Sequence, residues 1–410
     1  MLDRIHMFVP FRHSAIVNGE LNQHENSIRT VDLTSLGVPL SGSVHHGPDG
    51  TVEVDNLKHP WESLSTGFTP LAFKIFHQSS GFRSMPGIEL KASPAKLLQG
   101  HNVFGPTCIQ KGAEVMFMWL AGAYPQLFSM LDVAETQVYS IDCTYSARLP
   151  NEKTALQVIQ ALSGVTNGQT KARGDNYQTT AYWGAKESRL KRLKAYLKHT
   201  EFEKNLEELR AAGRSDLSAA RSYYAMAKPE LREWVKYLLR FEATVMHRWL
   251  ERRGVPSRLV DLIAHQKKLA EQGRCFIQEC WQEVTKDIFA AFEGLTMRVI
   301  DDEKVLAALI AKHTRYNKKG KPSDSYARNL FRTYRSIKEF GWDETFSSMG
   351  RASFYNHVRD ISAAGLSKAS LQKLQENDRT NNVVPLLRFV QVDFGAQRPD
   401  WYVEPSVEAA

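Results

Sequence analysis

The chain has 410 residues, of which 42% are hydrophobic and 24% are charged, which predicts a folded globular protein with room for two or more domains. Its formal net charge of +8 favours a polyanionic partner. Nucleic acid is favoured over a membrane, because no stretch approaches ~20 uninterrupted apolar residues. The composition therefore argues against extensive disorder and against a membrane-spanning protein.

The cysteines and the first residues predict a location in a reducing cytoplasm. The cysteines show neither a C-x-x-C motif nor a Cys/His zinc spacing, so we expect four free thiols, at Cys108, Cys143, Cys275 and Cys280. The opening stretch, MLDRIHMFVPFRHS, has charges within its apolar run and no cleavage-site pattern. This argues against a secretory signal.

The first 90 residues predict a β-rich opening. Short strand-like runs alternate with Gly, Pro and Ser turns, at positions 5–9, 51–54, 71–76 and 88–91. Ser93 as N-cap, Pro94 at the first helical position and Gly100 at the end then predict a short helix. His101 and Asn102 follow in a loop, where a hydrogen-bonded turn is the commoner role of such residues.

The next part of the chain predicts an α+β domain built on an antiparallel sheet. A strand at 138–148 lies between helices expected at 114–131 and 152–162. A strand at 177–183 precedes a second one at 192–199 through a GAKES turn, and a further strand is expected at 239–246.

Three of these strands each carry one chemically useful residue on a polar face. Their odd positions are mostly apolar, so the period of two places the even positions on the opposite face, with Asp142, Tyr196 and Glu242. Two carboxylates can hold a hard divalent cation, and a phenol flanked by Lys194 and Lys198 can become a phenolate nucleophile. The set indicates a DNA-nicking site. From alternation alone, ordinary half-buried strands with a solvated polar face are the commoner explanation.

A nicking site needs a cation near the phosphate, because negative charge develops on the nonbridging and leaving oxygens during in-line attack. We expect Asp142 and Glu242 to bind Mg²⁺ or Mn²⁺, with water and phosphate oxygens completing the shell. Glu201 and His199 are additional candidate ligands. His199 falls on the apolar face of a regular strand, so a core role is favoured for it unless a bulge intervenes.

An ordinary tyrosine has a pKa of about 10, so attack near neutral pH requires nearby cations. Lys198 and Lys194 lie two residues on either side of Tyr196 and would share its face. Lys198 is the first candidate for lowering the tyrosine pKa or for protonating the leaving oxygen, and phosphate contact is the alternative for both lysines. Arg240 and Arg148 lie on the equivalent faces of their strands, where they would contact flanking phosphates.

The second half of the first domain is predicted to be helical. A charged stretch at about 202–235 forms a helical insertion between the tyrosine and glutamate strands, and such a segment is most often a solvated amphipathic bundle. Helices continue through 258–272 and 275–292. We therefore place the first domain at 1–295.

The chain changes character near position 297. A basic, turn-rich run at 313–338 precedes a helix-turn-helix-like segment at 352–377, where Gly365 suits a C-cap and Ser367 the next N-cap. This predicts a smaller, mostly helical C-terminal domain at 297–410 with a DNA-binding or regulatory role. Helical hairpins with this punctuation are common, so a plain hairpin is the alternative.

Short motifs spread along the chain resemble the replication initiators of filamentous bacteriophages. They occur in the expected order from the first quarter to the C-terminus, so the resemblance covers essentially the whole chain. The motifs are KASPAKLLQGHNVFGPT (91–107), IDCTYSAR (141–148), NGQT (167–170), AYLKH (195–199), LRFEA (239–243), NNVVPLLRF (381–389) and QRPDWY (397–402).

The resemblance implies rolling-circle initiation in the cytoplasm of a bacterial host. Such proteins nick the viral strand of duplex phage DNA at the origin through a 5′-phosphotyrosine and later reseal the displaced strand. The tyrosine of AYLKH is the nucleophile of the family and falls on Tyr196. The resemblance also places His101 and Asn102 beside the DNA or the metal, and it implies that Met297 is an internal start for a separately made C-terminal protein.

More distantly, the ID, Y-x-K and RFE strands look like those of plasmid initiators that bind metal through carboxylates. One feature departs from the wider nickase superfamily: no His-x-His occurs among the 13 histidines, so the usual histidine pair cannot form the metal site.

The expected partners are double-stranded and single-stranded origin DNA, with self-association at the origin as a further expectation. A tyrosyl phosphodiester conserves the bond energy of the cut strand, so resealing needs no ATP. The chain has no G-x-x-x-x-G-K-[ST] motif, so unwinding would need a host helicase and synthesis a host DNA polymerase.

Two other classes of function stay open at the level of sequence. A tyrosine recombinase or type IB topoisomerase also uses tyrosine, but it stays attached to the 3′ end and needs no metal. A noncatalytic origin-binding or regulatory protein would depend on its basic surface alone. Sensitivity to EDTA, the DNA end that becomes attached and the effect of Tyr196→Phe distinguish the three.

Overall fold

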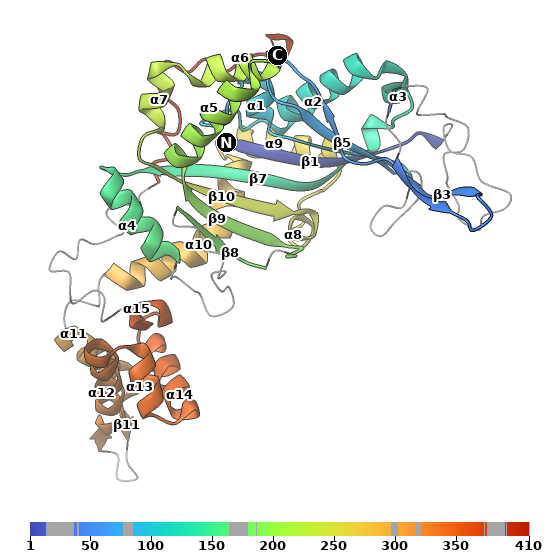
Figure 1. The fold of residues 1–410 in the computed structure, drawn as a ribbon. Helices are drawn as coiled ribbons and strands as arrows, with labels where there is room; N and C mark the ends of the chain where they lie inside the picture. The colour runs from blue at the N-terminus through green and yellow to red at the C-terminus, as the bar shows by residue number, and fades with distance from the viewer. Residues whose placement is uncertain are drawn as a thin grey trace.

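The computed structural model of the chain describes residues 1–13, 37–38, 41–76, 85–163, 179–185, 187–296, 302–316, 321–372, 374, 390 and 392–409. The motifs NGQT at 167–170 and NNVVPLLRF at 381–389, and Met297, lie outside the described residues. Within them the α+β prediction is confirmed: helices accompany an antiparallel sheet, and the C-terminal part is mostly helical (Figure 1).

An eight-stranded sheet with the order β4-β5-β6-β1-β7-β10-β9-β8 forms the centre of the first domain, and all its neighbouring strands are antiparallel. Its strands are β1 (Leu2–Pro10), β4 (Glu62–Leu64), β5 (Leu71–Phe76), β6 (Gly87–Ala92), β7 (Gln137–Arg148), β8 (Thr180–Trp183), β9 (Lys191–Leu197) and β10 (Leu238–Met246). Two smaller sheets pair β2 (Ser41–His46) with β3 (Val52–Lys58) and β11 (Arg315–Tyr316) with β12 (Pro322–Ser323).

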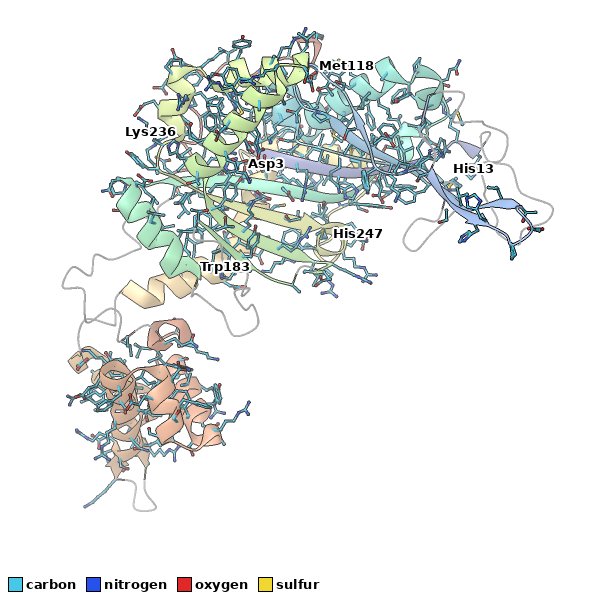
Figure 2. The ribbon with its side chains drawn as sticks, in the orientation of Figure 1. Asp3, His13, Met118, Trp183, Lys236 and His247 are labelled. Carbon is cyan, nitrogen blue, oxygen red and sulfur yellow. The ribbon has the colours of Figure 1, made fainter. Side chains whose placement is uncertain are left out.

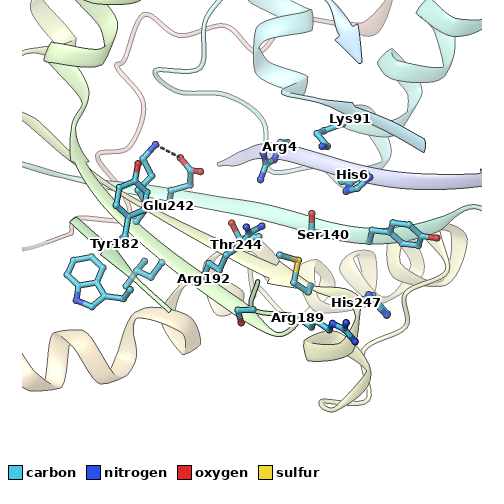
Figure 3. Close-up of a pocket in the computed structure, with 16 residues that line it drawn as sticks. Arg4, His6, Lys91, Ser140, Tyr182, Arg189, Arg192, Glu242, Thr244 and His247 are labelled. Carbon is cyan, nitrogen blue, oxygen red and sulfur yellow. Dashed lines mark ion pairs between the residues drawn. The ribbon is translucent and has the colours of Figure 1, made fainter. Parts of the chain in front are cut away.

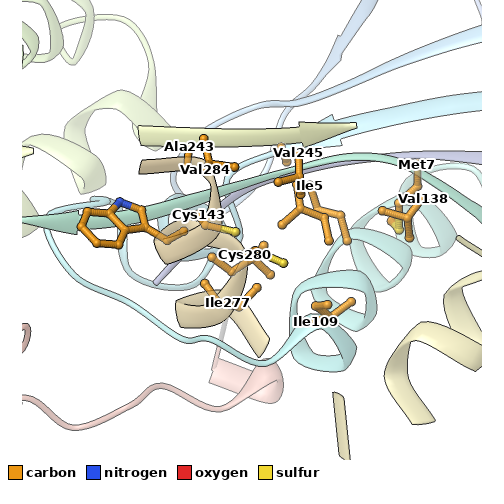
Figure 4. Packing of buried hydrophobic residues seen from close by; sticks show 14 of the residues in the cluster. Ile5, Met7, Ile109, Val138, Cys143, Ala243, Val245, Ile277, Cys280 and Val284 are labelled. Atoms are coloured by element: carbon orange, nitrogen blue, oxygen red, sulfur yellow. The ribbon is translucent and has the colours of Figure 1, made fainter. Parts of the chain in front are cut away.

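One face of the large sheet is apolar and carries the core. Cys143 and Val245 on this face pack with Cys280 and Val284 of the helix behind them (Figure 4). The Trp281 indole N–H donates to the Phe241 carbonyl of β10, 3.1 Å away, so a buried polar group is satisfied across this interface. The opposite face is polar and is left for chemistry. Asp3 lies on β1 in this part of the sheet (Figure 2).

The helices of the first domain cover both the core and one end of the polar face. They are α1 (Pro94–Gln99), α2 (Ile109–Ala123), α3 (Pro125–Ser129), α4 (Glu152–Ser163), α5 (Lys198–Ala212), α6 (Leu217–Met226), α7 (Pro229–Val235), α8 (His247–Glu251), α9 (Leu259–Glu271) and α10 (Phe276–Thr296). Helices α4 and α10 contact strands of the apolar face. No helix in the described ranges is long and apolar enough to cross a membrane.

Helix boundaries agree with local chemistry. Gly100 closes α1 in the left-handed conformation, at φ 79°, as predicted. The single helix expected at 114–131 is wrong in two respects, because α2 begins earlier, at Ile109, and a new helix starts at Pro125. The Cys108 side chain accepts from the Lys111 backbone N–H and caps the earlier start, and proline cannot continue a helix that precedes it.

The helical insertion begins four residues before its predicted start. Strand β9 ends at Leu197, so Lys198 and His199 belong to the first turn of α5 and not to the strand. Glu201 lies in the same turn, where the helix dipole favours a carboxylate, and it pairs with Lys198 at 2.5 Å. These contacts end the strand, and the prediction of a strand to position 199 is wrong.

The C-terminal helices have a core of their own. They are α11 (Asp302–His313), α12 (Ser325–Phe340), α13 (Trp342–Ser348), α14 (Arg351–Ala363) and α15 (Lys368–Gln372). Gly365, at φ 104°, ends α14 as predicted. The last residues of the chain return to the first domain, where Val390 is buried in its core and Phe394 packs against it. The predicted boundary near 297 therefore separates two cores but not two continuous stretches of chain.

Candidate functional site

The three strands singled out in the sequence are neighbours in the sheet. In the register of β7, β10 and β9, Asp142 is opposite Thr244, and Tyr196 is opposite Arg240. Because directly opposed residues share a face, Asp142, Glu242 and Tyr196 all lie on the polar face. Alternation therefore predicted their common face correctly, and the pairing brings them together.

Asp142 and Glu242 form an acidic pair with too little positive charge around it. The buried Asp142 accepts an ion pair from Arg4 at 2.7 Å, while its Oδ1 is buried without a hydrogen-bond partner. Burial raises the pKa of Asp142. Burial, with the charges of Asp142 and Asp3, raises the pKa of Glu242 to about 7, although Lys194 lies 4.0 Å from it (Figure 3).

These acids have the donor chemistry of a hard-cation site, because carboxylate oxygens are the ligands that Mg²⁺ and Mn²⁺ prefer. The unpartnered Oδ1 of Asp142 and the raised pKa of Glu242 both indicate negative charge that a cation would stabilise. In the described part of the chain, no three His, Cys, Asp or Glu side chains converge in metal-binding geometry. Water and substrate oxygens would have to supply the remaining ligands.

The two additional candidate ligands do not join the acidic pair. Both carboxylate oxygens of Glu201 are engaged, by Lys198 at 2.5 Å and by Asn205 at 2.6 Å. Burial alone would raise the pKa of Glu201, but Lys198 lowers it to about 2. His199 is half-buried at the start of α5, 4.0 Å from Glu203. The favoured core role for His199 is therefore wrong, because the residue is helical.

Tyr196 lies on the polar face but is not open to solvent, since only 5% of it is exposed. Burial raises its pKa well above the ordinary value, and the charge of Arg240 opposes this shift. The Lys194 ammonium is 4.1 Å from the centre of the tyrosine ring and the Lys198 ammonium 6.0 Å. The hydroxyl is therefore protonated in this DNA-free state, and flanking lysines do not make it a phenolate here.

Lys198 is held in a buried polar network. Its ammonium group donates to the Asn102 side-chain oxygen at 2.9 Å and to Glu201, and Asn102 in turn donates to Asp3 at 2.8 Å. Burial, with the charge of Arg240, lowers the pKa of Lys198 to about 8. An ammonium group with this pKa is a better proton donor near neutral pH than an ordinary lysine.

The predicted phosphate-binding arginines are anchored to the protein's own backbone. Arg240 is buried and donates to the carbonyls of Asn102, at 2.5 Å, and Val103. Its guanidinium also hydrogen-bonds the Tyr196 side chain. Arg148 donates to the Trp234 carbonyl at 3.0 Å and stacks on that indole ring.

His101 is buried beside these groups, in contact with the Phe104 ring. Burial and nearby cations lower its pKa to about 3, so the imidazole is neutral.

A basic groove runs along the polar face beside the acidic pair and was not identified in the sequence. Its cavity measures about 510 Å³ and includes Glu242 and Lys194 in its lining (Figure 3). Its other cationic and aromatic lining residues are Arg4, His6, Lys91, Arg189, Arg192, His247, Tyr139, Tyr182 and Trp183. The even positions of β1 carry part of this signal, but nothing local indicates that β1 pairs with β7.

A lysine-flanked tyrosine, a carboxylate pair and a basic, aromatic groove on one sheet face are the features of a protein that handles a nucleic-acid strand. The comparisons agree. Residues 1–271 match the N-terminal model, and residues 317–408 the C-terminal model, of the phage gene II replication-associated protein. The chain therefore belongs to the family of filamentous phage replication-associated proteins.

Individual relatives match over their full length. The replication-associated protein of Salmonella phage IKe is 38% identical over 413 residues, covering 99% of this chain and 96% of the relative. That of Enterobacteria phage M13 is 38% identical over 418 residues and is covered completely, as is this chain. No solved structure matches this chain.

The pKa of Glu242 predicts how stability depends on pH. Because the folded-state pKa of about 7 lies above the ordinary value of 4.5, ionisation of Glu242 opposes folding at pH 8 and not below about pH 4. We expect Glu242→Gln to raise the free energy of unfolding by about 2 kcal/mol at pH 8 without divalent cations. Denaturant unfolding at several pH values measures this.

Added Mn²⁺ should stabilise the wild-type protein more than Glu242→Gln, because a ligand stabilises the state that binds it. The exposed Glu207, on α5, provides the control substitution Glu207→Gln, which should change nothing. Equal stability of the wild-type protein and Glu242→Gln at pH 8, with no effect of Mn²⁺ on either, would contradict the prediction.

Proposed function

We propose that the chain nicks the viral strand of duplex phage DNA at the origin through Tyr196, starts rolling-circle replication and later religates the displaced strand. The observation that carries the proposal is the position of Tyr196 on one sheet face with the acidic pair and the basic groove. Membership of the replication-associated family supports a role at phage DNA.

In the proposed reaction the Tyr196 oxygen forms a bond to the scissile phosphorus as the bond to the 3′ oxygen breaks. The tyrosine proton leaves to water, and the departing 3′ oxygen gains a proton, for which the Lys198 ammonium is our candidate donor. The products are a 5′-phosphotyrosine and a free 3′-hydroxyl. Resealing is the reverse attack by a 3′-hydroxyl, which returns the tyrosine and needs no ATP.

Asp142 and Glu242 would hold Mg²⁺ or Mn²⁺, which would supply positive charge to the oxygens of the scissile phosphate. Without DNA, burial keeps Tyr196 protonated, so its hydroxyl must become accessible to a phosphate before attack. Unwinding by a host helicase and synthesis by a host polymerase remain part of the proposal, as does self-association at the origin.

Tyr196→Phe should bind origin DNA like the wild-type protein but neither nick it nor form a covalent adduct, because the attacking oxygen is absent. Tyr224→Phe, on the exposed face of α6, is the matched control and should retain both activities. Mass spectrometry of nicked DNA should locate the adduct on Tyr196 and on the 5′ side of the cut. An adduct on another tyrosine, or on the 3′ end, would refute the assignment.

We further propose that the basic groove holds the single strand next to the cut. Cationic side chains would contact phosphates, and Tyr139 and Tyr182 offer ring faces to bases.

Substituting Lys91→Gln and Arg192→Gln together should weaken single-strand binding and lower the slope of log affinity against log salt by about one unit or more, because fewer counterions are released. Lys267→Gln and Lys268→Gln on α9 make the same charge change on an exposed helix behind the sheet, and should have little effect. Equal affinities and salt slopes for the two double variants would exclude the groove as the strand site.

The C-terminal helices offer a second DNA-contacting surface in this proposal. Arg328, Arg332 and Arg335 recur at helical spacing on the exposed side of α12, within the basic run singled out in the sequence. The helix-turn-helix expectation at 352–377 is weaker, because α15 ends at Gln372 and has only five residues.

Arg332→Glu with Arg335→Glu should reduce the affinity of the full chain for duplex DNA and make binding less dependent on salt. Cleavage of a single-stranded origin oligonucleotide should persist, because these residues lie outside the site around Tyr196. Filter binding and gel-based cleavage measure the two quantities. Unchanged duplex affinity at low salt would assign this domain a role other than DNA contact.

A further inference from the structure

The last part of the chain crosses the first domain. Residues 392–408, called the C-terminal strap here, follow the C-terminal helices in sequence but pack against the nicking domain. The Phe394 ring contacts Tyr145, with 5.0 Å between ring centres, and Trp281 at 5.6 Å. Lys111 of α2 pairs with Glu404 at 2.6 Å. The strap is thus fixed to the domain at both ends.

The middle of the strap completes an unpaired stretch of β7. Strand β1 reaches only as far as Cys143, which is opposite Leu2, so β7 has no β1 partner beyond that point. Gln397 fills this position with its side chain. Its amide oxygen accepts from the Ser146 N–H at 2.8 Å, and its amide nitrogen donates to the Ser146 carbonyl at 2.9 Å. This pair imitates the exchange between two strand residues.

The next strap residues hold the loop at 101–105. Arg398 donates to the Gly105 carbonyl at 2.9 Å. The Phe104 ring of the loop is in contact with the rings of Trp401, at 5.4 Å, and Tyr402, at 4.9 Å. Both rings meet Phe104 edge to face, an arrangement that favours one orientation.

These two sets of contacts converge on Arg240. Ser146, bound by Gln397, is directly opposite Arg240 in the sheet. The loop bound by Arg398 supplies the Asn102 and Val103 carbonyls to which the Arg240 guanidinium donates. Arg240 in turn hydrogen-bonds Tyr196 and is the cation that opposes the rise of the tyrosine pKa. The strap is therefore one residue removed from the nucleophile along both routes.

We propose that the C-terminal strap is a positioning element of the nicking site, in which Gln397 and Arg398 keep Arg240 against Tyr196. Its effect on nicking rests on the proposed function, whereas its effect on the 101–105 loop does not. The C-terminal part of the chain then contributes to the chemistry, although its own helices hold none of the reacting groups.

The test uses the full chain with Gln397→Glu, Arg398→Ala and Arg398→Lys. Glutamate keeps the size of Gln397 but cannot donate to the Ser146 carbonyl, and lysine can still donate to Gly105. Val403→Ala is the matched control, because Val403 belongs to the same strap and is 85% exposed. We expect Gln397→Glu and Arg398→Ala to lower the single-turnover nicking rate at saturating DNA by about tenfold or more, as misplacement of a reacting group does.

DNA affinity and melting temperature should change far less than the rate, and Arg398→Lys should recover part of it. Hydrogen exchange of the 101–105 amides should be faster in Gln397→Glu and Arg398→Ala, a result that does not require nicking. Wild-type rates and unchanged exchange in both variants would overturn the proposal, and so would losses of affinity and melting temperature in proportion to the rate. Wild-type protein and Tyr196→Phe, assayed in parallel, test the proposed function separately.

Discussion

The register of β7, β10 and β9 is the constraint on which the rest of the site depends. Antiparallel pairing without a slip places Asp142, Glu242 and Tyr196 on one face, and a shift of β9 by one residue would turn Tyr196 into the core. The apolar odd positions resist such a shift, because burial of each large side chain contributes ~1.5–3 kcal/mol. The packing of one face therefore determines the chemistry available on the other.

Electrostatics then explain why this face is inactive without its substrate. Burial favours the neutral forms of both Tyr196 and Glu242, and the nearby cations Arg4 and Lys194 are already paired with acids. A DNA phosphate adds negative charge to the same place. Only additional positive charge, of the kind a divalent cation supplies, would favour ionised acids, a phosphate and a phenolate together. A neutral tyrosine is the expected state of the DNA-free protein.

What could be predicted from the sequence was local. Alternation gave the polar faces of three strands, and the caps at Ser93 and Gly100 gave a helix. The same alternation failed at Lys198, because a contact with Glu201 ended the strand and began a helix. The remaining features depend on distant pairing. Arg4 reaches Asp142 only because β1 joins β7, and Ser146 meets a glutamine 251 residues away.

The 101–105 loop connects three distant parts of the chain to the tyrosine. The helical insertion reaches it through Lys198 and Asn102, the strap reaches it through Arg398 and Gly105, and the sheet reaches it through Arg240. Each contact ends on a backbone carbonyl or an amide side chain of the loop, so movement of one part alters the geometry that the others contact. The surroundings of Tyr196 are therefore set jointly by all three parts, and strand pairing alone accounts only for the face on which it lies.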